Sequence, residues 1–340
     1  MNKLIVILIF TNFVVADICP KYGKQCPSTS PCCSGDGFCS SNPEDCLSGC
    51  NANASYKPDS CYPRPPCVDY SDDFTSSSSL MNINNFNGDP SKAAWLMEQS
   101  TYSSIANGNL NLWMQATSQK GPTGVIQGLG ARVSWSRWIQ YGNVTVRLKT
   151  ATGGGVVTSF IARSGVGSDN NSSFVEDEID YEWVGGDLLT TETNYYAFGN
   201  LSYNNVKMIP TANTFTDYHT YMVQWQPDLI TWWIDGVALR TLYQKDVGTQ
   251  FPSRLSRIQF SIWDSNSGAA GTVSWAKGPT DWSNPTNPNY KVQIDSVNIS
   301  CYYKGNGSWT YNSAAHTSVH RYYLVLFCLW GWLFCLWWWL

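Results

Sequence analysis

Short runs of β-branched and aromatic residues with alternating polarity fill the chain from about residue 68 to residue 303. Six runs are clear, at residues 143–150, 155–163, 218–227, 230–242, 257–264 and 290–300. Gly, Pro, Asn and Asp separate them at short intervals, as at Asp235 and Gly236, which is typical of strands joined by tight turns. No long amphipathic helix pattern appears. The pattern predicts an all-β sandwich of about 235 residues, a normal size for one such domain.

The cysteine pattern separates a small N-terminal module from this sandwich. Nine of the 12 cysteines fall between Cys19 and Cys67, and the next is Cys301. Because apolar residues are few in the first segment, disulfides must hold it. We also expect a bridge from Cys67 to Cys301, since the first and last strands of a sandwich often lie side by side, although spacing alone cannot fix the connectivity.

Both ends of the chain have the pattern of processing signals. Residues 1–16 combine one lysine, an apolar run and small residues near the expected cleavage point, as in a secretory signal peptide. Residues 322–340 are an apolar run that follows small residues and a polar spacer, with no Lys or Arg after it. This is typical of the removed signal for a glycosylphosphatidylinositol anchor, and a transmembrane span is the alternative. We expect residues 313–340 to be removed and the anchor to be attached at Asn312 or the adjacent Ser313.

Two further features agree with an extracellular protein. Acceptor sequences for N-glycosylation begin at Asn53, Asn143, Asn170, Asn171, Asn200, Asn298 and Asn306. Without the C-terminal segment ten cysteines remain, an even number in an oxidising compartment. We therefore expect a disulfide-bonded glycoprotein at the cell surface and in the cell wall, held to the plasma membrane by a lipid anchor.

Charge and histidine content exclude several classes of function. The formal net charge is -4 and no basic run is present, which argues against a nucleic-acid partner. Of three histidines, only His219 would remain in the mature chain, so a histidine metal cluster is excluded and a Ser/His/Asp triad would depend on that residue. We treat His219 as structural and expect neither a metal nor a cofactor.

One segment concentrates acid in a chain that is only 14% charged. In residues 177–183, DEIDYEW, strict alternation in a strand places Glu178, Asp180 and Glu182 on one face and three large side chains on the other. Asp177 lies outside the alternation. A solvated outer face is the simplest interpretation, because acidic residues on exposed strands are common.

The same three carboxylates also suit glycoside chemistry. Retaining catalysis uses two carboxyl groups about 5 to 5.5 Å apart. Alpha-carbons four residues apart on a strand lie about 13 Å apart, and two glutamates reaching about 4 Å each toward a sugar between them approach that separation. Asp180 between them would orient the nucleophile and help to keep the acid protonated.

Residues 178–182, followed by Trp-Val-Gly-Gly-Asp, resemble the catalytic strand of glycoside hydrolase family sixteen, specifically the Crh type of fungal cell-wall transglycosylases. Residues 88–95, 193–200, 218–242 and 271–282 resemble further stretches of that group in the same order, and the similarity spans residues 61–303. The resemblance implies a concanavalin-like β-jelly-roll with a substrate groove. It also implies Glu178 as nucleophile, Asp180 as its assistant and Glu182 as general acid/base.

The resemblance further implies groove residues. Trp275 matches the tryptophan of the family's Trp-Ala-Gly-Gly stretch, which implies stacking on a sugar, and Lys277 stands where that stretch usually has glycine. Asn194, Tyr195 and Trp263 are additional candidates for the groove wall. Core packing is the alternative for every aromatic residue in a domain of this kind.

Residues 19–46 resemble the hevein-like chitin-binding fold, whose adjacent cysteine pair is matched by Cys32 and Cys33. That pattern implies the pairs Cys19–Cys33, Cys26–Cys39 and Cys32–Cys46. Ser34 and Phe38 match its binding residues, whereas Asp36 and Asp45 stand where aromatics are expected. Because each ring stacked on a sugar contributes about 0.5 to 1.5 kcal/mol, chitin targeting and a retained structural cap remain alternatives.

Together these features predict a retaining cell-wall transglycosylase that cleaves chitin and transfers the sugar to β-glucan or chitin through a glycosyl ester on Glu178. The alternatives are a hydrolytic β-glucanase or chitinase, and an inactive wall lectin, against which the complete acidic triad argues. We expect a monomer with a signal peptide at residues 1–16, a cysteine-rich module at residues 17–67 and a catalytic domain at residues 68–303. The link at residues 304–312 is short, which would keep the domain near the membrane.

Overall fold

The computed structural model describes residues 19, 25–34, 37–47, 50–164, 176–198, 200, 203–285 and 287–304. The predicted signal peptide, the C-terminal segment 313–340 and Asn312 lie outside the described residues, as do Asp36 and the acceptors Asn170, Asn171 and Asn306. Within the described ranges, no helix combines the length and the apolar character needed to cross a membrane.

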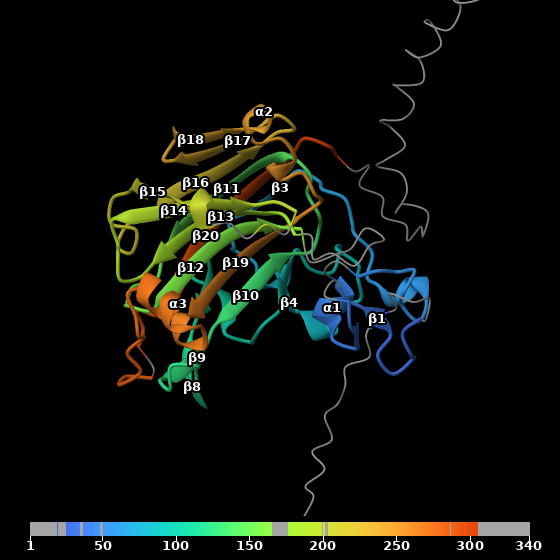
Figure 1. Ribbon diagram of the computed structural model, residues 1–340, viewed down its shortest axis with the longest axis horizontal. Helices are drawn as coiled ribbons and strands as arrows, with labels where there is room; N and C mark the ends of the chain where they lie inside the picture. The colour runs from blue at the N-terminus through green and yellow to red at the C-terminus, as the bar shows by residue number, and fades with distance from the viewer. Residues whose placement is uncertain are drawn as a thin grey trace, which may run out of the picture.

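Two large, mostly antiparallel sheets pack face to face and form the body of the molecule (Figure 1). The first sheet has the order β15 (Lys207–Pro210), β14 (Thr190–Tyr196), β13 (Glu178–Val184), β12 (Val156–Arg163), β19 (Arg257–Asp264), β10 (Ala131–Trp135), β5 (Trp95–Met97) and β4 (Leu80–Asn82). The second has the order β18 (Val237–Tyr243), β17 (Leu229–Ile234), β16 (His219–Trp225), β11 (Gly142–Lys149), β20 (Lys291–Cys301), β7 (Asn109–Trp113) and β6 (Ser103–Ala106), with β3 (Tyr70–Asp72) also paired to β20. The predicted all-β sandwich is confirmed.

Shorter elements connect and flank these sheets. They are β1 (Cys32–Cys33), β2 (Cys39–Ser40), α1 (Pro43–Leu47), η1 (Pro58–Ser60), η2 (Ser77–Ser79), η3 (Ile83–Asn85), β8 (Gln115–Lys120), β9 (Ile126–Leu129), η4 (Tyr203–Asn205), α2 (Gln244–Val247), η5 (Gly248–Gln250), η6 (Ser265–Ser267) and α3 (Ala270–Trp275). Figure 1 shows α1 and β1 beside the end of the sandwich that carries β4, whereas α3 lies at another end, near β12 and β19.

An aromatic core lies between the two sheets, and the back of β13 is part of it. The Tyr181 ring stacks on Trp183 at 5.8 Å between centroids, and Trp183 meets Tyr221 of the second sheet edge-on at 4.6 Å. The Tyr181 hydroxyl donates a hydrogen bond to the Trp233 carbonyl at 2.8 Å, and Trp232 Nε1 donates to the Asp180 carbonyl at 3.0 Å. Both sheets therefore hold β13 in place from behind.

Five disulfides are present among the described cysteines. They join Cys19 to Cys33, Cys26 to Cys39, Cys32 to Cys46, Cys50 to Cys61 and Cys67 to Cys301. The first three and the last are the pairs expected above, and the fourth is additional. The sulfurs of Cys19, Cys26 and Cys33 lie within 4.8 Å of one another, but each is committed to a disulfide and is not available as a thiolate ligand.

The cysteine-rich segment packs against the sandwich through α1. Leu47, at the end of α1, is 1% exposed and lies in one apolar cluster with Ile83, Phe86 and Leu96. Glu44 in the same helix contacts Arg132 on β10. The segment therefore adjoins the first sheet at the β10, β5 and β4 side.

Two predicted glycosylation sequences face each other on the outer surface of the second sheet. In the pairing of β11 with β20, Asn143 lies opposite Ser300 and Thr145 lies opposite Asn298. The residues between them, Val144 and Ile299, are buried, so both asparagines point away from the core.

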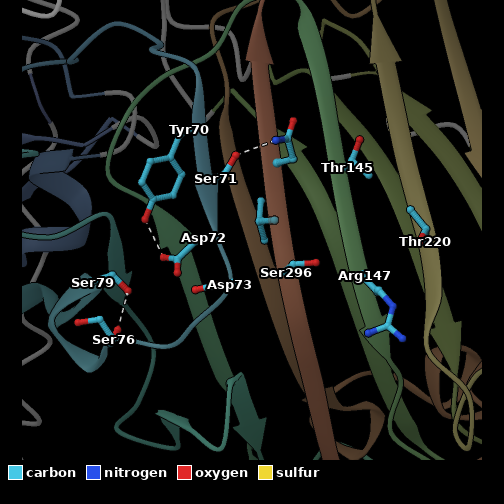
Figure 2. Close-up of a pocket in the computed structure, with 12 residues that line it drawn as sticks. Tyr70, Ser71, Asp72, Asp73, Ser76, Ser79, Thr145, Arg147, Thr220 and Ser296 are labelled. Carbon is cyan, nitrogen blue, oxygen red and sulfur yellow. Dashed lines mark hydrogen bonds between the residues drawn. The ribbon is translucent and has the colours of Figure 1, made fainter.

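A polar depression of about 620 Å³ lies on this same outer surface (Figure 2). Figure 2 shows Ser71, Thr145, Arg147, Thr220 and Ser296 around it. None of the predicted catalytic residues lines this depression, since the acidic strand belongs to the other sheet.

Replacing Cys67 and Cys301 together by serine is expected to lower the free energy of unfolding of the sandwich by about 3 to 5 kcal/mol, because the bridge closes a very long loop and restricts the unfolded chain. The two residues are 234 positions apart. Thermal unfolding followed by circular dichroism measures the effect. A matched control, Cys26→Ser with Cys39→Ser, opens a bridge of 13 positions within the cysteine-rich segment and should leave the unfolding of the sandwich unchanged. Equal melting of the Cys67/Cys301 variant and the parent would contradict the stabilising role.

Candidate active site

The acidic strand lies inside the first sheet, between β12 and β14. Ile179, Tyr181 and Trp183 are each about 1% exposed or less and face the core. Glu178, Asp180 and Glu182 project from the opposite face, which we call the active face. The alternation predicted from DEIDYEW is the one in the structure.

Side chains of the neighbouring strands surround the three carboxylates. Opposite Glu178 are Arg163 and Tyr196, opposite Asp180 are Ile161 and Asn194, and opposite Glu182 are Ser159 and Glu192. The two glutamates therefore have different neighbours, since an arginine lies opposite one of them and a carboxylate opposite the other.

Asp180 is the most enclosed carboxyl group of the three. It is 1% exposed, and its burial raises its pKa well above the usual value, with the negative charges of Glu178 and Glu182 adding to the effect. A hydrogen bond with Glu178 raises the pKa further. Protonation of Asp180 is therefore favoured, and in its protonated form it can donate to the Glu178 carboxylate.

Glu182 also retains its proton at neutral pH. Burial raises its pKa to about 8, and the charges of Glu178 and Glu192 contribute in the same direction. A carboxyl group that is still protonated near pH 7 can act as a general acid.

Arg163 supplies positive charge at the other end of the strand. Its Nε lies 3.4 Å from Glu178 Oε2, and its Nη2 donates to Glu176 Oε2 at 3.1 Å. Glu176 is 3% exposed and fixes the guanidinium from its far side. Glu178 thus lies beside a cation, whereas Glu182 lies opposite a second carboxyl group.

Asp177 has a structural role. Its carboxylate accepts hydrogen bonds from the backbone N–H groups of Phe198, Ser253 and Arg254, at 2.9, 2.7 and 3.0 Å. These bonds join the segment after β14 and the segment before β19 to the start of β13. This explains the one acid of DEIDYEW that falls outside the alternation.

Two of the predicted aromatic residues form a pair at the Glu182 side of the active face. The rings of Trp263 and Trp275 stack at 5.9 Å between centroids, and both side chains are partly buried. Trp275 Nε1 donates to Glu192 Oε2 at 3.2 Å. Asn194, 3% exposed, also lies on this face, opposite Asp180.

Lys277 occupies a glycine-like backbone position next to this pair. Its φ is 57°, in the left-handed region that favours glycine, which agrees with the glycine usual at this position in the resembling sequences. Gly186 leaves room for it, because a Cβ at Gly186 would lie 2.7 Å from Lys277 Cβ. The backbone turn is thus retained here with a charged side chain.

Tyr195 does not lie on the active face. It pairs with Ile179, is 6% exposed in the core, and has the Arg240 guanidinium of the second sheet 5.6 Å from its ring centre. Its placement in the groove wall is therefore wrong, because the side chains of a strand alternate. Tyr196, opposite Glu178, is the aromatic residue of this strand on the active face.

The two candidates in the cysteine-rich segment lie close together. The Phe38 backbone N–H donates to Ser34 Oγ at 3.3 Å, and the Phe38 side chain is 44% exposed. Asp45, where an aromatic is expected, accepts a hydrogen bond from Ser40 Oγ at 2.6 Å. Tyr56 is a further exposed aromatic residue of this segment that the motif comparison did not identify.

Arg163, Glu176, Glu192 and Tyr196 were missed because sequence reasoning centred on one strand. The alternation of TTETNYY, residues 190–196, would have placed Glu192, Asn194 and Tyr196 on one face and Tyr195 on the other. No comparable signal pairs Arg163 with Glu178, since the strand pairing that brings them together is not visible in the sequence.

Known proteins are similar to this chain in sequence and in fold. The family model of glycosyl hydrolases family 16 matches residues 89–295. Crh-like protein 3 of Botryotinia fuckeliana is 37% identical over 290 residues, 82% of this chain and 60% of that protein. Congo red hypersensitive protein 2 of Saccharomyces cerevisiae is 38% identical over 291 residues, 82% of this chain and 58% of that protein. The chain thus spans about three fifths of the length of these relatives.

Among solved structures, a Crh5 transglycosylase in complex with NAG has a TM-score of 0.55 with this chain at 26% identity. The superposition covers 71% of this chain and 86% of the other. The fold of the sandwich is therefore similar to that of the Crh5 transglycosylase.

The variant Glu182→Gln is expected to remove a pH-dependent loss of stability. The folded protein holds the Glu182 proton up to about pH 8, whereas the unfolded chain releases it near pH 4.5. Stability therefore falls as pH rises between these values. The pKa difference corresponds to about 4 kcal/mol of stability lost between pH 4 and pH 8. The gain in unfolding temperature of the variant over the parent should therefore be about 8 to 16 °C larger at pH 8 than at pH 4.

The control is Asp228→Asn, which removes an exposed carboxylate from the turn between β16 and β17. Its melting profile should follow that of the parent at every pH. A Glu182→Gln profile that also follows the parent would exclude a protonated Glu182.

Proposed function

This chain belongs to glycosyl hydrolases family 16, and we propose that it is a retaining cell-wall transglycosylase that cleaves chitin and transfers the released end to β-glucan or chitin. The observation that carries the proposal is the unequal surroundings of two glutamates on one strand. Glu178 lies 3.4 Å from Arg163, and Glu182 lies opposite another carboxylate with its pKa raised to about 8 by burial and by the charges of Glu178 and Glu192. One is suited to attack as an anion and the other to donate a proton.

In the first step Glu182 protonates the glycosidic oxygen while the Glu178 carboxylate attacks the anomeric carbon. The bond from that carbon to the glycosidic oxygen breaks, and its electron pair and the proton leave with the shortened chain as a hydroxyl group. The retained sugar forms an ester with Glu178. Asp180, whose raised pKa favours its protonated form, shares a hydrogen bond with Glu178 and orients the attacking carboxylate.

In the second step Glu182, now ionised, takes the proton of an acceptor hydroxyl. The acceptor oxygen bonds to the anomeric carbon, the ester breaks, and Glu178 regains its charge. Two displacements at one carbon retain its configuration. A sugar acceptor gives transfer and water gives hydrolysis, so the two outcomes differ only in the second step.

Three groups on the active face are proposed to bind the sugar chain. Trp275 and Trp263 would offer aromatic surface at the Glu182 side, and Asn194 lies opposite Asp180 with its Oδ1 free of hydrogen bonds to described atoms. Aromatic rings suit sugars because each pyranose presents an apolar face of C–H groups. Support for N-acetylglucosamine polymers comes from the similarity to the Crh5 transglycosylase, whose structure contains NAG.

The cysteine-rich segment is proposed to assist by holding chitin through Phe38 and Ser34. Only Phe38 of the expected aromatics is present, so retention as a structural cap is the competing role. The packing of α1 on the sandwich suits either role, since it keeps the segment beside the first sheet.

An extracellular location in the cell wall is proposed for the mature protein. Five disulfides and the outward-facing acceptors Asn143 and Asn298 support passage through the secretory pathway. Cleavage after residue 16, a cysteine-rich module at residues 17–67, a catalytic domain at residues 68–303 and a lipid anchor at Asn312 complete the proposal, with the protein acting as a monomer.

Incubation of the secreted protein with chitin oligosaccharides and a fluorescent β-glucan oligosaccharide tests the function. Hybrid products are expected from a transglycosylase, short chitin products alone would indicate a chitinase, and retention without products would indicate a lectin. Glu178→Gln should lower the rate of hybrid formation by at least about 10³-fold, and Glu182→Gln by about 10² to 10⁴-fold.

Asp228→Asn serves as the matched control, because it also replaces a carboxylate by its amide but lies in a turn of the second sheet. Its rate should equal that of the parent. Unchanged hybrid formation by Glu178→Gln would rule out the ester on that residue.

A further inference from the structure

A fourth carboxylate lies on the active face, and the mechanism above does not use it. Glu192 on β14 pairs directly with Glu182 on β13. It is 8% exposed, and on its other side it pairs with Met208 of β15, which offers no charge. Directly opposed residues of an antiparallel pair have Cβ atoms about 4.5 to 5.5 Å apart.

This juxtaposition opposes folding unless a proton is shared. Like charges directly opposite on a sheet are destabilising, and neither Glu182 nor Glu192 forms a salt bridge with a described residue. The arrangement becomes favourable when one of the two carboxyl groups is protonated and the other is ionised.

The groups that face Glu192 come from four elements. Glu182 faces it from β13, with Glu178 and Asp180 farther along that strand, and Met208 faces it from β15. Trp275 Nε1 donates to it from α3, and Lys277 lies just after α3. Asp187 lies in the turn before β14.

These neighbours have opposing effects on Glu192. Its pKa is raised overall, with burial as the main cause and the charge of Asp187 adding to it, whereas the Trp275 hydrogen bond and the charge of Lys277 act in the opposite direction. The indole N–H of Trp275 and the ammonium group of Lys277 therefore favour the ionised form of Glu192. Glu182 has no such support, because burial and the charges of Glu178 and Glu192 all raise its pKa. The proton of the pair belongs on Glu182.

We propose that Glu192 is a positioning residue for proton transfer, which keeps the proton on Glu182 and, through the Trp275 indole, aligns that proton with the stacked tryptophan pair. The proposal rests on the function proposed above. In the first step a charged Glu192 holds Glu182 in its acid form before a sugar binds. In the second step the same charge makes ionised Glu182 a stronger base toward the acceptor hydroxyl.

Glu192 also joins the acid to the candidate sugar-binding surface. Its Oε2 is 3.2 Å from Trp275 Nε1, and the Trp275 ring stacks on Trp263. One side chain thus contacts the ring proposed to bind sugar and faces the group that protonates it. An uncharged amide could still accept the hydrogen bond from Trp275, but it could not place a negative charge beside Glu182. Removing only the charge therefore separates the two roles.

The variant Glu192→Gln tests this role, because glutamine keeps the shape and an acceptor oxygen for Trp275 but removes the charge. The basic limb of the pH profile of kcat/KM should move about one pH unit lower, since a neighbouring like charge shifts a pKa by about that amount or more. Activity at pH 5 should stay within about twofold of the parent, and activity at pH 8 should fall about fivefold. An unchanged basic limb would overturn the proposal.

A second variant separates charge from structure. Glu192→Ala also loses the hydrogen bond to Trp275, so its kcat/KM should fall at every pH and its basic limb should move as in Glu192→Gln. If Glu192 only supports Trp275, the alanine variant would lose activity without any shift, and the glutamine variant would match the parent throughout.

A thermal double-mutant cycle keeps this inference distinguishable from the proposed function, since it needs no substrate. The extra unfolding temperature that Glu182→Gln gains at pH 8 should be smaller in the Glu192→Gln background than in the parent background. Coupling without turnover of any polysaccharide would reject the proposed function and retain the proton-sharing pair. Turnover with an additive cycle and an unmoved basic limb would reject the pair and retain the function.

Discussion

The chemistry of this protein depends on how firmly the core holds the back of one strand. Three carboxylates on β13 and a fourth on β14 repel one another on the active face. Opposing this repulsion, Tyr181 and Trp183 are buried against aromatic side chains of both sheets, and burial of such rings contributes about 1.5 to 3 kcal/mol each. The hydrogen bonds from Tyr181 to the Trp233 carbonyl and from Trp232 to the Asp180 carbonyl link the strand to the second sheet. The alternation of DEIDYEW thus combines a stabilising face with a costly one.

Much of the fold and the acidic triad could be predicted because both follow from local alternation. The six polar-apolar runs correspond to strands β11, β12, β16, β19 and β20 and to the β17–β18 hairpin. Neighbouring strands could not be predicted in the same way, because pairing joins segments far apart in sequence. Arg163 and Glu192 decide the electrostatics of the site and both belong to partner strands. Tyr195 was misplaced because its motif was read without the alternation that sends adjacent residues to opposite faces.

The two ends of β13 have opposite electrostatic surroundings on the active face, which suits Glu178 and Glu182 to the different roles proposed for them. At the Glu178 end, Arg163 is held by Glu176, so positive charge is available to a carboxylate. At the Glu182 end, burial and Glu192 disfavour ionisation. Burial raises the pKa of Asp180, which lies between them, well above its usual value. A sugar lying across β13 would therefore meet a carboxyl group beside a cation at one end and a carboxyl group opposite a second glutamate at the other.

Arg163, at the Glu178 end of the active face, is connected to the cysteine-rich segment by a row of alternating charges. Glu44 of α1 contacts Arg132, whose Nε lies 3.0 Å from Glu98 Oε2, and Glu98 Oε1 lies 2.6 Å from Arg257 Nη2. Arg257 pairs across the strands with Arg163.

Each arginine of this row has a carboxylate of its own, so two adjacent guanidinium groups are tolerated in a place where Arg257 is 1% exposed. Removing one partner would leave a buried charge uncompensated, at a cost of about 3 to 5 kcal/mol. The cysteine-rich segment therefore contributes to the charge balance of the first sheet as well as packing beside it. Its Glu44 helps to neutralise the row of arginines that begins at β10 and ends beside Glu178.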